Sequence, residues 1–134
     1  MTIVVDASAL LEYLLGTVLG GPIGKKLRSA GSDLDTVVLC DVEIVSGLRS
    51  ALFRKELSSD RATQALQDHM DLPLRYHSHR PLLQRMWDLR NNFSAYDAAY
   101  VGLAEHLGAS FLTADDRLAK SVGIHTTIRL VEIE

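Results

Sequence analysis

Four acidic residues, far apart in this 134-residue chain, occupy equivalent places in its hydrophobic pattern: Asp6, Glu43, Asp97 and Asp115. Each lies where an apolar, strand-like run gives way to a helix-like run. In an open parallel α/β sheet, the strand ends of one polarity lie along one edge, and ligands bind there. The pattern therefore predicts that the four carboxylates meet at one edge of a sheet and form a strongly anionic pocket.

A pocket of four carboxylates predicts a divalent-cation site. Like charges at close range repel one another, and cations that prefer hard oxygen ligands, such as Mg²⁺ or Mn²⁺, offset that repulsion. One ion can activate a water for in-line attack on phosphorus, and a second, about 3.5–4 Å away, can stabilise the leaving oxygen. The sequence does not decide between one ion and two. No activated Ser, His or Cys nucleophile is evident, so the pattern favours metal-dependent hydrolysis of phosphodiester bonds.

Each acid also has a simpler interpretation as part of a helix cap. Asp is a favoured N-cap, and a negative charge near a helix N-terminus is stabilised by roughly 0.3–1 kcal/mol, so Asp6 and Asp115 could do only this. Ser94 and Asp97 have the spacing of a capping box, and Glu43 could be a solvated acid in a first turn. The coincidence of four such acids favours the cation site. The apolar neighbours of Asp6 and Glu43, among which an unpaired charge is unfavourable, also favour it.

Alternating strand-like and helix-like segments place the chain in the α/β class. Short apolar runs are typical of buried parallel strands, and apolar residues at helical spacing predict the helices between them. We find no repeat and no linker long enough to divide the chain, and therefore expect a single domain over residues 1–134 with a central, mainly parallel sheet. The expected strands are 3–5, 37–40, 74–77, 110–112 and, at an edge, 128–133; the expected helices are 8–15, 22–30, 42–56, 61–70, 81–89, 94–107 and 115–121, with a loop at 31–33.

The composition is that of an ordinary globular protein, with 47% apolar and 23% charged residues. No run approaches the ~18 apolar residues of a membrane span, and no signal peptide is evident. The single cysteine, Cys40, lies in an apolar run and is expected to be buried, so we expect a cytoplasmic protein without membrane contact. The net charge is −3, and it would be +1 without the four proposed cation-binding acids. A negative net charge does not exclude a nucleic-acid substrate, because nucleic-acid binding needs only local positive potential.

The segments around the four acids resemble the motifs of the PIN-domain ribonucleases, in particular the VapC-type toxins of bacterial toxin–antitoxin pairs. Their order and spacing cover the whole chain, and the last two together are the most specific. One departure concerns a proline that such toxins often carry several residues before the glutamate; here that stretch ends in Asp41, which adds a competing acid. The matching segments are Val4–Leu10, Asp41–Arg49, Ala95–Glu105 and Phe111–Ala119.

The resemblance implies a PIN-like three-layer α/β/α sandwich and a site in which Asp6, Glu43, Asp97 and Asp115 form the catalytic, metal-binding tetrad. Ser8 and Thr113 match positions whose hydroxyls support the acidic cluster. Asp116, which has the spacing of a capping box with Thr113, is grouped with them as a supporting residue whose role stays open.

The resemblance also implies an activity and partners. The activity is that of a Mg²⁺- or Mn²⁺-dependent endoribonuclease that cuts a structured RNA, such as transfer or ribosomal RNA, by metal-activated water. The partners are a second copy of the chain, in a homodimer, and a small VapB-like antitoxin. The apolar residues of the 11–19 stretch exceed what one short helix needs, and they could line a groove for an apolar antitoxin helix.

Other functions fit the sequence less well. An aspartyl-phosphate phosphatase would carry a second acid two residues after Asp6, where this chain has Ser8. A response-regulator receiver would carry paired acids at the first strand and a late lysine, and the chain shows neither arrangement. The alternative that stays open is a non-catalytic PIN-fold protein that binds nucleic acid or acts as a scaffold.

Overall fold

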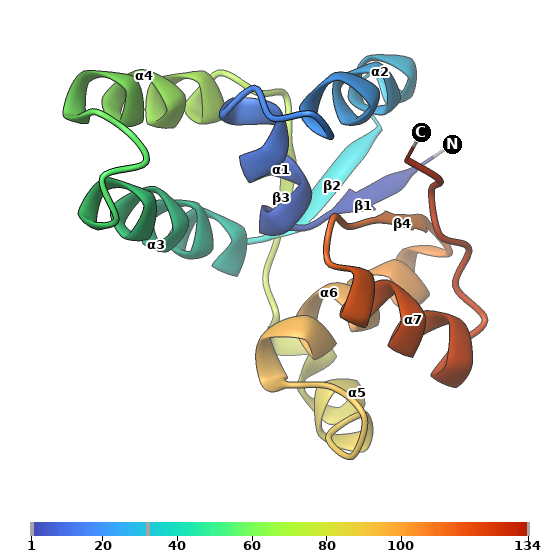
Figure 1. Ribbon diagram of the computed structural model, residues 1–134. Coiled ribbons are helices and arrows are strands. Elements are labelled where there is room, and N and C mark those ends of the chain that lie inside the picture. Colours follow the sequence, from blue (N-terminus) through green and yellow to red (C-terminus); the bar gives the residue numbers. More distant parts are fainter. Residues whose placement is uncertain (1, 32, 134) are drawn as a thin grey trace.

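The computed structural model describes residues 2–31 and 33–133, and in this part of the chain four strands alternate with seven α-helices (Figure 1). The strands are β1 (Ile3–Val5), β2 (Leu34–Val37), β3 (Arg75–His77) and β4 (Ser110–Leu112). The helices are α1 (Ala7–Leu14), α2 (Gly20–Ala30), α3 (Leu39–Phe53), α4 (Ser59–Met70), α5 (Leu83–Asp88), α6 (Ala95–Leu107) and α7 (Asp116–His125), with a 3₁₀ turn, η1 (Arg80–Leu82), directly before α5.

The strands form one parallel sheet in the order β3-β2-β1-β4. Val4, on the inner strand β1, pairs with Asp35 of β2 on one side and with Phe111 of β4 on the other. Helices α1 to α4 gather on one side of the sheet, and α5 to α7 on the other (Figure 1). The predicted α/β fold with a parallel sheet is therefore confirmed. Because the strands run the same way, their carboxyl ends share one edge.

The apolar strands and helix α6 form the centre of the core. Val4, Val5, Phe111 and Leu112 are completely buried, as expected for strands that are covered on both faces. Helix α6 packs directly against β1, β2 and β4, and its residues 98–104 are all buried. The position of the first turn of α6, which carries Asp97, is therefore fixed by the packing of the whole helix on the sheet.

The predicted last residues of α4 (Met70) and α6 (Leu107) are confirmed, whereas α4 begins at Ser59, two residues earlier than predicted. Ser58 and Ser94 are the N-caps of α4 and α6, and Gly108, in the left-handed region at φ 61°, ends α6. Helix α7 reaches His125, four residues further than predicted. The loop predicted at 31–33 includes Ser32, which lies outside the described residues. No helix in the described part of the chain combines the length and the apolar character that a membrane span requires.

The predicted second strand, 37–40, is wrong in its position. Strand β2 ends at Val37, and Val38 already has helical dihedral angles (φ −58°, ψ −28°) as the N-cap of α3. The strand consists instead of residues 34–37, in which Asp35 and Thr36 are buried. Glu43 consequently does not lie at the junction of strand and helix, as predicted, but in the second turn of α3.

The predicted edge strand at 128–133 is also wrong. In the described residues this segment makes a single parallel bridge, between Leu130 and Phe111. Two hydrogen bonds support the bridge: the Phe111 N–H donates to Arg129 O, and the Val131 N–H donates to Phe111 O, each at 2.9 Å.

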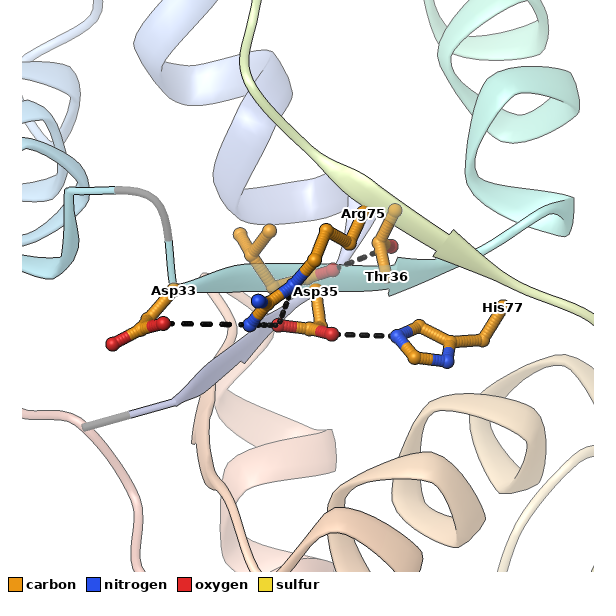
Figure 2. A network of polar contacts seen from close by, with 6 residues as sticks. Asp33, Asp35, Thr36, Arg75 and His77 are labelled. Atoms are coloured by element: carbon orange, nitrogen blue, oxygen red, sulfur yellow. Dashed lines mark hydrogen bonds and ion pairs between the residues drawn. The ribbon is translucent and has the colours of Figure 1, made fainter.

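A buried ion network holds the edge strand β3 to β2. The Asp35 side chain, which is 3% exposed, accepts hydrogen bonds from Arg75 Nη2 (2.8 Å) and from His77 Nε2 (2.5 Å). Figure 2 shows Arg75 and His77 reaching Asp35 along one side of the two strands, with Asp33 beyond Arg75. Burial alone would raise the pKa of Asp35, but the hydrogen bonds from Arg75 and His77 outweigh it and hold the pKa below its ordinary value.

The first prediction concerns this network. Asp35→Asn should lower the free energy of unfolding at pH 7 by about 1.5–3 kcal/mol, the range for hydrogen bonds to charged groups. Because the pKa of Asp35 is lower in the folded protein than in the unfolded chain, its contribution is complete above about pH 4 and is lost as the pH falls further. Urea unfolding at pH 7 and pH 3 measures both effects. Glu56→Gln, in the exposed Arg54–Glu56 pair, is the control and should change little. An Asp35→Asn effect that is equally large at both pH values would contradict the prediction.

Candidate active site

Asp6 is the most buried of the four predicted acids. It follows β1, caps the N-terminus of α1, and is only 4% exposed. Its Oδ1 accepts hydrogen bonds from the Ser8 hydroxyl (2.7 Å) and the Ala9 N–H (3.0 Å), and its Oδ2 accepts one from the Thr113 hydroxyl (2.5 Å). Burial raises the pKa of Asp6 to about 6; the three hydrogen bonds oppose this shift, and the charge of Asp97 adds to it.

Two hydroxyls join the start of α1 to the end of β4. The Ser8 and Thr113 hydroxyls lie 3.2 Å apart. Each also accepts a hydrogen bond from the backbone. The Ala114 N–H donates to Ser8 (3.0 Å), and the Asp115 N–H donates to Thr113 (3.1 Å). The two residues that were predicted to support the acidic cluster therefore both contact Asp6. The same hydrogen bonds fix the backbone that leads into Asp115.

Asp115 is the N-cap of α7. Its Oδ1 accepts hydrogen bonds from the backbone N–H groups of Arg117 (3.0 Å) and Leu118 (3.1 Å). The capping interpretation is therefore correct for Asp6 and Asp115, and capping leaves further carboxylate lone pairs available. Asp116 lies exposed in the first turn of α7. Because Asp115 is the N-cap, Thr113 and Asp116 do not form a capping box.

Glu43 extends from the second turn of α3 and is half-buried. Its Oε1 accepts a hydrogen bond from the hydroxyl of Tyr100 at 2.6 Å. Burial raises the pKa of Glu43, the hydrogen bond from Tyr100 opposes that shift, and the charge of Asp97 adds to it. Tyr100 was not among the predicted site residues. The one available signal was its position three residues after Asp97, which places both residues on one face of a helix.

Asp97 connects the other acids electrostatically. It lies in the first turn of α6, where its backbone N–H donates to the hydroxyl of Ser94, the N-cap, at 3.1 Å. Burial raises the pKa of Asp97, and the charge of Asp115 raises it further. Asp97 in turn raises the pKa values of Asp6 and Glu43. Asp97 is thus electrostatically coupled to Asp6, Glu43 and Asp115, and these four residues are called the acidic group below.

Asp41, the competing acid, belongs to a different network. Its Oδ1 lies 2.7 Å from Nε2 of the buried His69 and accepts a hydrogen bond from the Tyr76 hydroxyl at 2.8 Å. These contacts tie the start of α3 to the end of α4 and to β3. The Asp41 carboxylate is therefore engaged outside the acidic group.

A cavity of about 350 Å³ lies against the acidic group. Asp97 and Asp115 line it together with Arg117, so the cavity combines negative charge with a cation. The full lining comprises Asn92, Phe93, Ser94, Asp97, Asp115, Arg117, Leu118 and Ser121. Such a cavity can admit a phosphate group beside the carboxylates.

The donor set of the acidic group fits a small divalent cation. Its ligand atoms are carboxylate and hydroxyl oxygens, which are the ligands that Mg²⁺ and Mn²⁺ prefer. In the described residues, no three Asp, Glu, His or Cys side chains converge closely enough to hold one ion together. Mg²⁺ commonly binds through one or two carboxylates and keeps several waters, so a site for it does not require three converging ligands.

The sequence comparisons point to one family. A family model described as the PIN domain matches residues 3–123. Ribonuclease VapC12 of Mycobacterium tuberculosis is 36% identical over 129 residues, which cover 96% of this chain and 98% of the relative. Ribonuclease VapC9 of the same organism is 41% identical over 117 residues, which cover 87% of this chain and 88% of the relative.

Solved structures share the fold. PAE2754 from Pyrobaculum aerophilum superposes with a TM-score of 0.73 at 20% identity, covering 97% of this chain and 83% of that protein. Mycobacterium tuberculosis VapC20, described as a Sarcin-Ricin loop cleaving toxin, superposes with a TM-score of 0.65 at 15% identity, covering 90% of this chain and 95% of that protein. At these identities the likeness concerns the fold alone.

The second prediction separates capping from charge crowding at Asp97. Because the pKa of Asp97 is raised in the folded protein, ionisation of Asp97 destabilises the fold as the pH rises above its ordinary value of about 4. Asp97→Asn should therefore make the metal-free protein at least as stable as the parent at pH 7.5, and this advantage should disappear at pH 4. Ser94→Ala, which removes the true cap, should instead cost about 1 kcal/mol. Denaturant unfolding in excess chelator measures the free energy of unfolding of the parent and of each variant. If Asp97→Asn were less stable than the parent at pH 7.5, ionised Asp97 would not be destabilising the metal-free fold.

Proposed function

Since this chain belongs to the PIN-domain family and is a VapC-type ribonuclease toxin, we propose that it is a metal-dependent endoribonuclease whose site is the acidic group at the carboxyl edge of the sheet. The observation that carries the proposal is the electrostatic coupling of Asp6, Glu43 and Asp115 to Asp97 beside a cavity that can admit a phosphate.

Asp6, Glu43, Asp97 and Asp115 are the proposed cation-binding residues. Since no three such side chains converge in the described part of the chain, one or two of them would bind an ion directly and the others through its waters. The raised pKa values of Asp6, Glu43 and Asp97, caused mainly by burial and further by neighbouring acids, mean that their ionised forms are held here at a cost in folding free energy. A bound Mg²⁺ or Mn²⁺ would neutralise that charge and supply the Lewis acidity that activates water and stabilises charge on the phosphate. The role of the carboxylates is to bind and orient, and none of them needs to act as a nucleophile.

The groups that line the cavity suit an RNA phosphate. Arg117 supplies a cation at the same edge as the acids, and Asn92 and Ser121 supply polar groups. In the proposed reaction the oxygen of water bonds to phosphorus while the bond from phosphorus to O3′ breaks, and the leaving O3′ takes up a proton. Because VapC20 is described as cleaving the Sarcin-Ricin loop, a structured RNA such as a ribosomal or transfer RNA is the proposed class of substrate.

The proposed homodimer has a candidate surface. An apolar groove of about 450 Å³ lies between the start of α3 and the start of α6. Val38, Val42 and Tyr96 line it and are 43%, 64% and 61% exposed, and the neighbouring Trp87 is 63% exposed. Apolar side chains gathered on a surface in this way mark protein–protein contacts. We therefore propose this groove as the contact between two copies.

The proposed antitoxin surface differs from the one expected from the sequence, which was the apolar stretch 11–19. Leu14 lies in the core at 4% exposure, so its side chain offers almost no surface to a partner, and in the 11–19 stretch Val18 and Leu19 are the exposed apolar residues. A second apolar groove, of about 190 Å³, runs between α3 and α4 and includes Val45, Leu52 and Leu66. These surfaces together are the proposed site for an apolar helix of a VapB-like antitoxin.

The third prediction tests the reaction. Cleavage of RNA should require Mg²⁺ or Mn²⁺, stop in excess chelator, and leave 5′-phosphate and 3′-hydroxyl ends, because water rather than the RNA 2′-hydroxyl attacks phosphorus. Asp6→Asn should reduce the rate by about 100-fold or more, which equals about 2.7 kcal/mol of lost transition-state stabilisation. Asp60→Asn, in the exposed first turn of α4, is the matched control and should keep full activity. Ends that carry a 2′,3′-cyclic phosphate would contradict the mechanism. Specific RNA binding without any cleavage would favour the non-catalytic alternative.

The fourth prediction tests the dimer surface. Val42→Asp places a charge in the proposed contact and should convert a dimer to a monomer at micromolar concentration, as measured by light scattering. Ile124→Asp on α7 is the matched control, because Ile124 is 66% exposed and does not line the groove. A parent that is monomeric throughout, or a Val42→Asp variant that stays dimeric, would show that the groove has another role.

A further inference from the structure

Tyr100 connects the helix that carries Asp97 to the carboxylate of Glu43. Its side chain is buried, with 2% of the residue exposed, and its hydroxyl donates to Glu43 Oε1 at 2.6 Å. A phenolic hydroxyl has one hydrogen to donate. That hydrogen is directed at the carboxylate, and the contact joins residues 57 positions apart in the sequence.

The position of the Tyr100 ring is set by elements that also carry other acids. Tyr100 follows Asp97 by three residues, so both side chains leave the same face of α6. The ring packs against Phe111 of β4, with the ring centroids 6.4 Å apart and the planes tilted by 33°. Strand β4 leads into Asp115. The hydroxyl therefore has a fixed place relative to Asp97 and Asp115.

Glu43 is not held at a helix N-terminus, as Asp6, Asp97 and Asp115 are. It stands one turn inside α3, not at a strand end, and its side chain has several rotatable bonds, which make it costly to hold in one geometry. In the described part of the chain, the Tyr100 hydroxyl is the one hydrogen-bond donor to its carboxylate. The contact occupies Oε1, and Oε2 stays available.

We propose that Tyr100 is a positioning residue, which fixes the Glu43 carboxylate through Oε1 and leaves Oε2 available to bind the cation of the proposed site. The inference rests on the proposed function, since it assigns a role toward the cation of that site. Hydrogen-bond partners of metal-ligating side chains orient their ligands, and their loss typically weakens metal affinity by 10–100-fold.

The chain offers a matched control. The hydroxyl of Tyr76 donates to Asp41 at 2.8 Å, which is the same type of bond on a carboxylate outside the acidic group. Tyr76→Phe and Tyr100→Phe each remove one oxygen and one hydrogen bond to an acid of α3. A difference between the two variants in cation binding therefore reports the role of Tyr100 at the site.

The experiment measures Mn²⁺ binding to the full chain by the electron paramagnetic resonance of free Mn²⁺, together with kcat and KM for RNA cleavage. Tyr100→Phe should raise the Mn²⁺ dissociation constant by 10–100-fold, leave KM for RNA within about two-fold, and regain cleavage at high Mn²⁺. Tyr76→Phe should match the parent. In a Glu43→Ala background, Tyr100→Phe should have no further effect on Mn²⁺ binding, because the two residues act as one unit.

Each contrary outcome overturns a defined part of the argument. The positioning role would be overturned, and the proposed function would stand, if Tyr100→Phe bound Mn²⁺ with the parent's affinity. The same would follow if Tyr100→Phe still weakened Mn²⁺ binding in the Glu43→Ala background. A parent that binds no Mn²⁺ and cleaves RNA in chelator would overturn the cation site and this inference together. If Tyr100→Phe does not fold, Tyr100→4-aminophenylalanine keeps an N–H donor and should retain the parent's affinity; a 10-fold loss in that variant would overturn the proposal.

Discussion

The buried carboxylate of Asp6 is the constraint around which the site is organised. An isolated charge at 4% exposure would be unfavourable, and the protein satisfies it with donors from two elements, Ser8 and Ala9 at the start of α1 and Thr113 at the end of β4. These donors can converge only if β1 and β4 are adjacent and parallel, as they are. The stability of Asp6 and the register of the sheet therefore depend on one another. The buried Asp35 shows the contrasting solution, since hydrogen bonds from the Arg75 guanidinium and from His77 hold its pKa down, whereas the neutral donors of Asp6 leave its pKa raised.

The elements that the sequence predicts well are those whose signal is local. Strand β1 is a continuous apolar run, and α6 begins at Ser94 and ends at Gly108, which are recognisable caps. Strand β2 was misplaced because its polar residues are stabilised by distant partners. Asp35 is held by residues 40 and 42 positions away, and Thr36 donates to the Val5 carbonyl at 2.8 Å. A pattern based on hydrophobicity places the strand on the next apolar run instead, which in the structure begins α3.

The four acids and the supporting hydroxyls of Ser8 and Thr113 could be proposed from the sequence for a similar reason, whereas the contact of Tyr100 with Glu43 could not. The four acids stand in segments whose order and spacing characterise the family, so they could be identified without a structure. Tyr100 looks like any buried aromatic on an apolar helix, and only the fold reveals that its hydroxyl meets Glu43. The same holds for Asp41, whose partners His69 and Tyr76 come from other elements. Residue type predicts the capacity for chemistry, while the assignment of partners needs tertiary structure.

Three helix N-termini explain how the chain tolerates its acids in the absence of a cation. Asp6 and Asp115 cap α1 and α7, and Asp97 lies in the first turn of α6, so each faces the partial positive charge of exposed backbone N–H groups. Each such interaction contributes about 0.3–1 kcal/mol, which is too little to cancel the effect of burial, since the pKa values of Asp6 and Asp97 remain raised. The remaining cost of ionising buried carboxylates, to which the neighbouring charges add, raises the free energy of the metal-free fold, and a bound cation would offset it. The same cost that limits the stability of the metal-free protein would thus contribute directly to its affinity for a divalent cation.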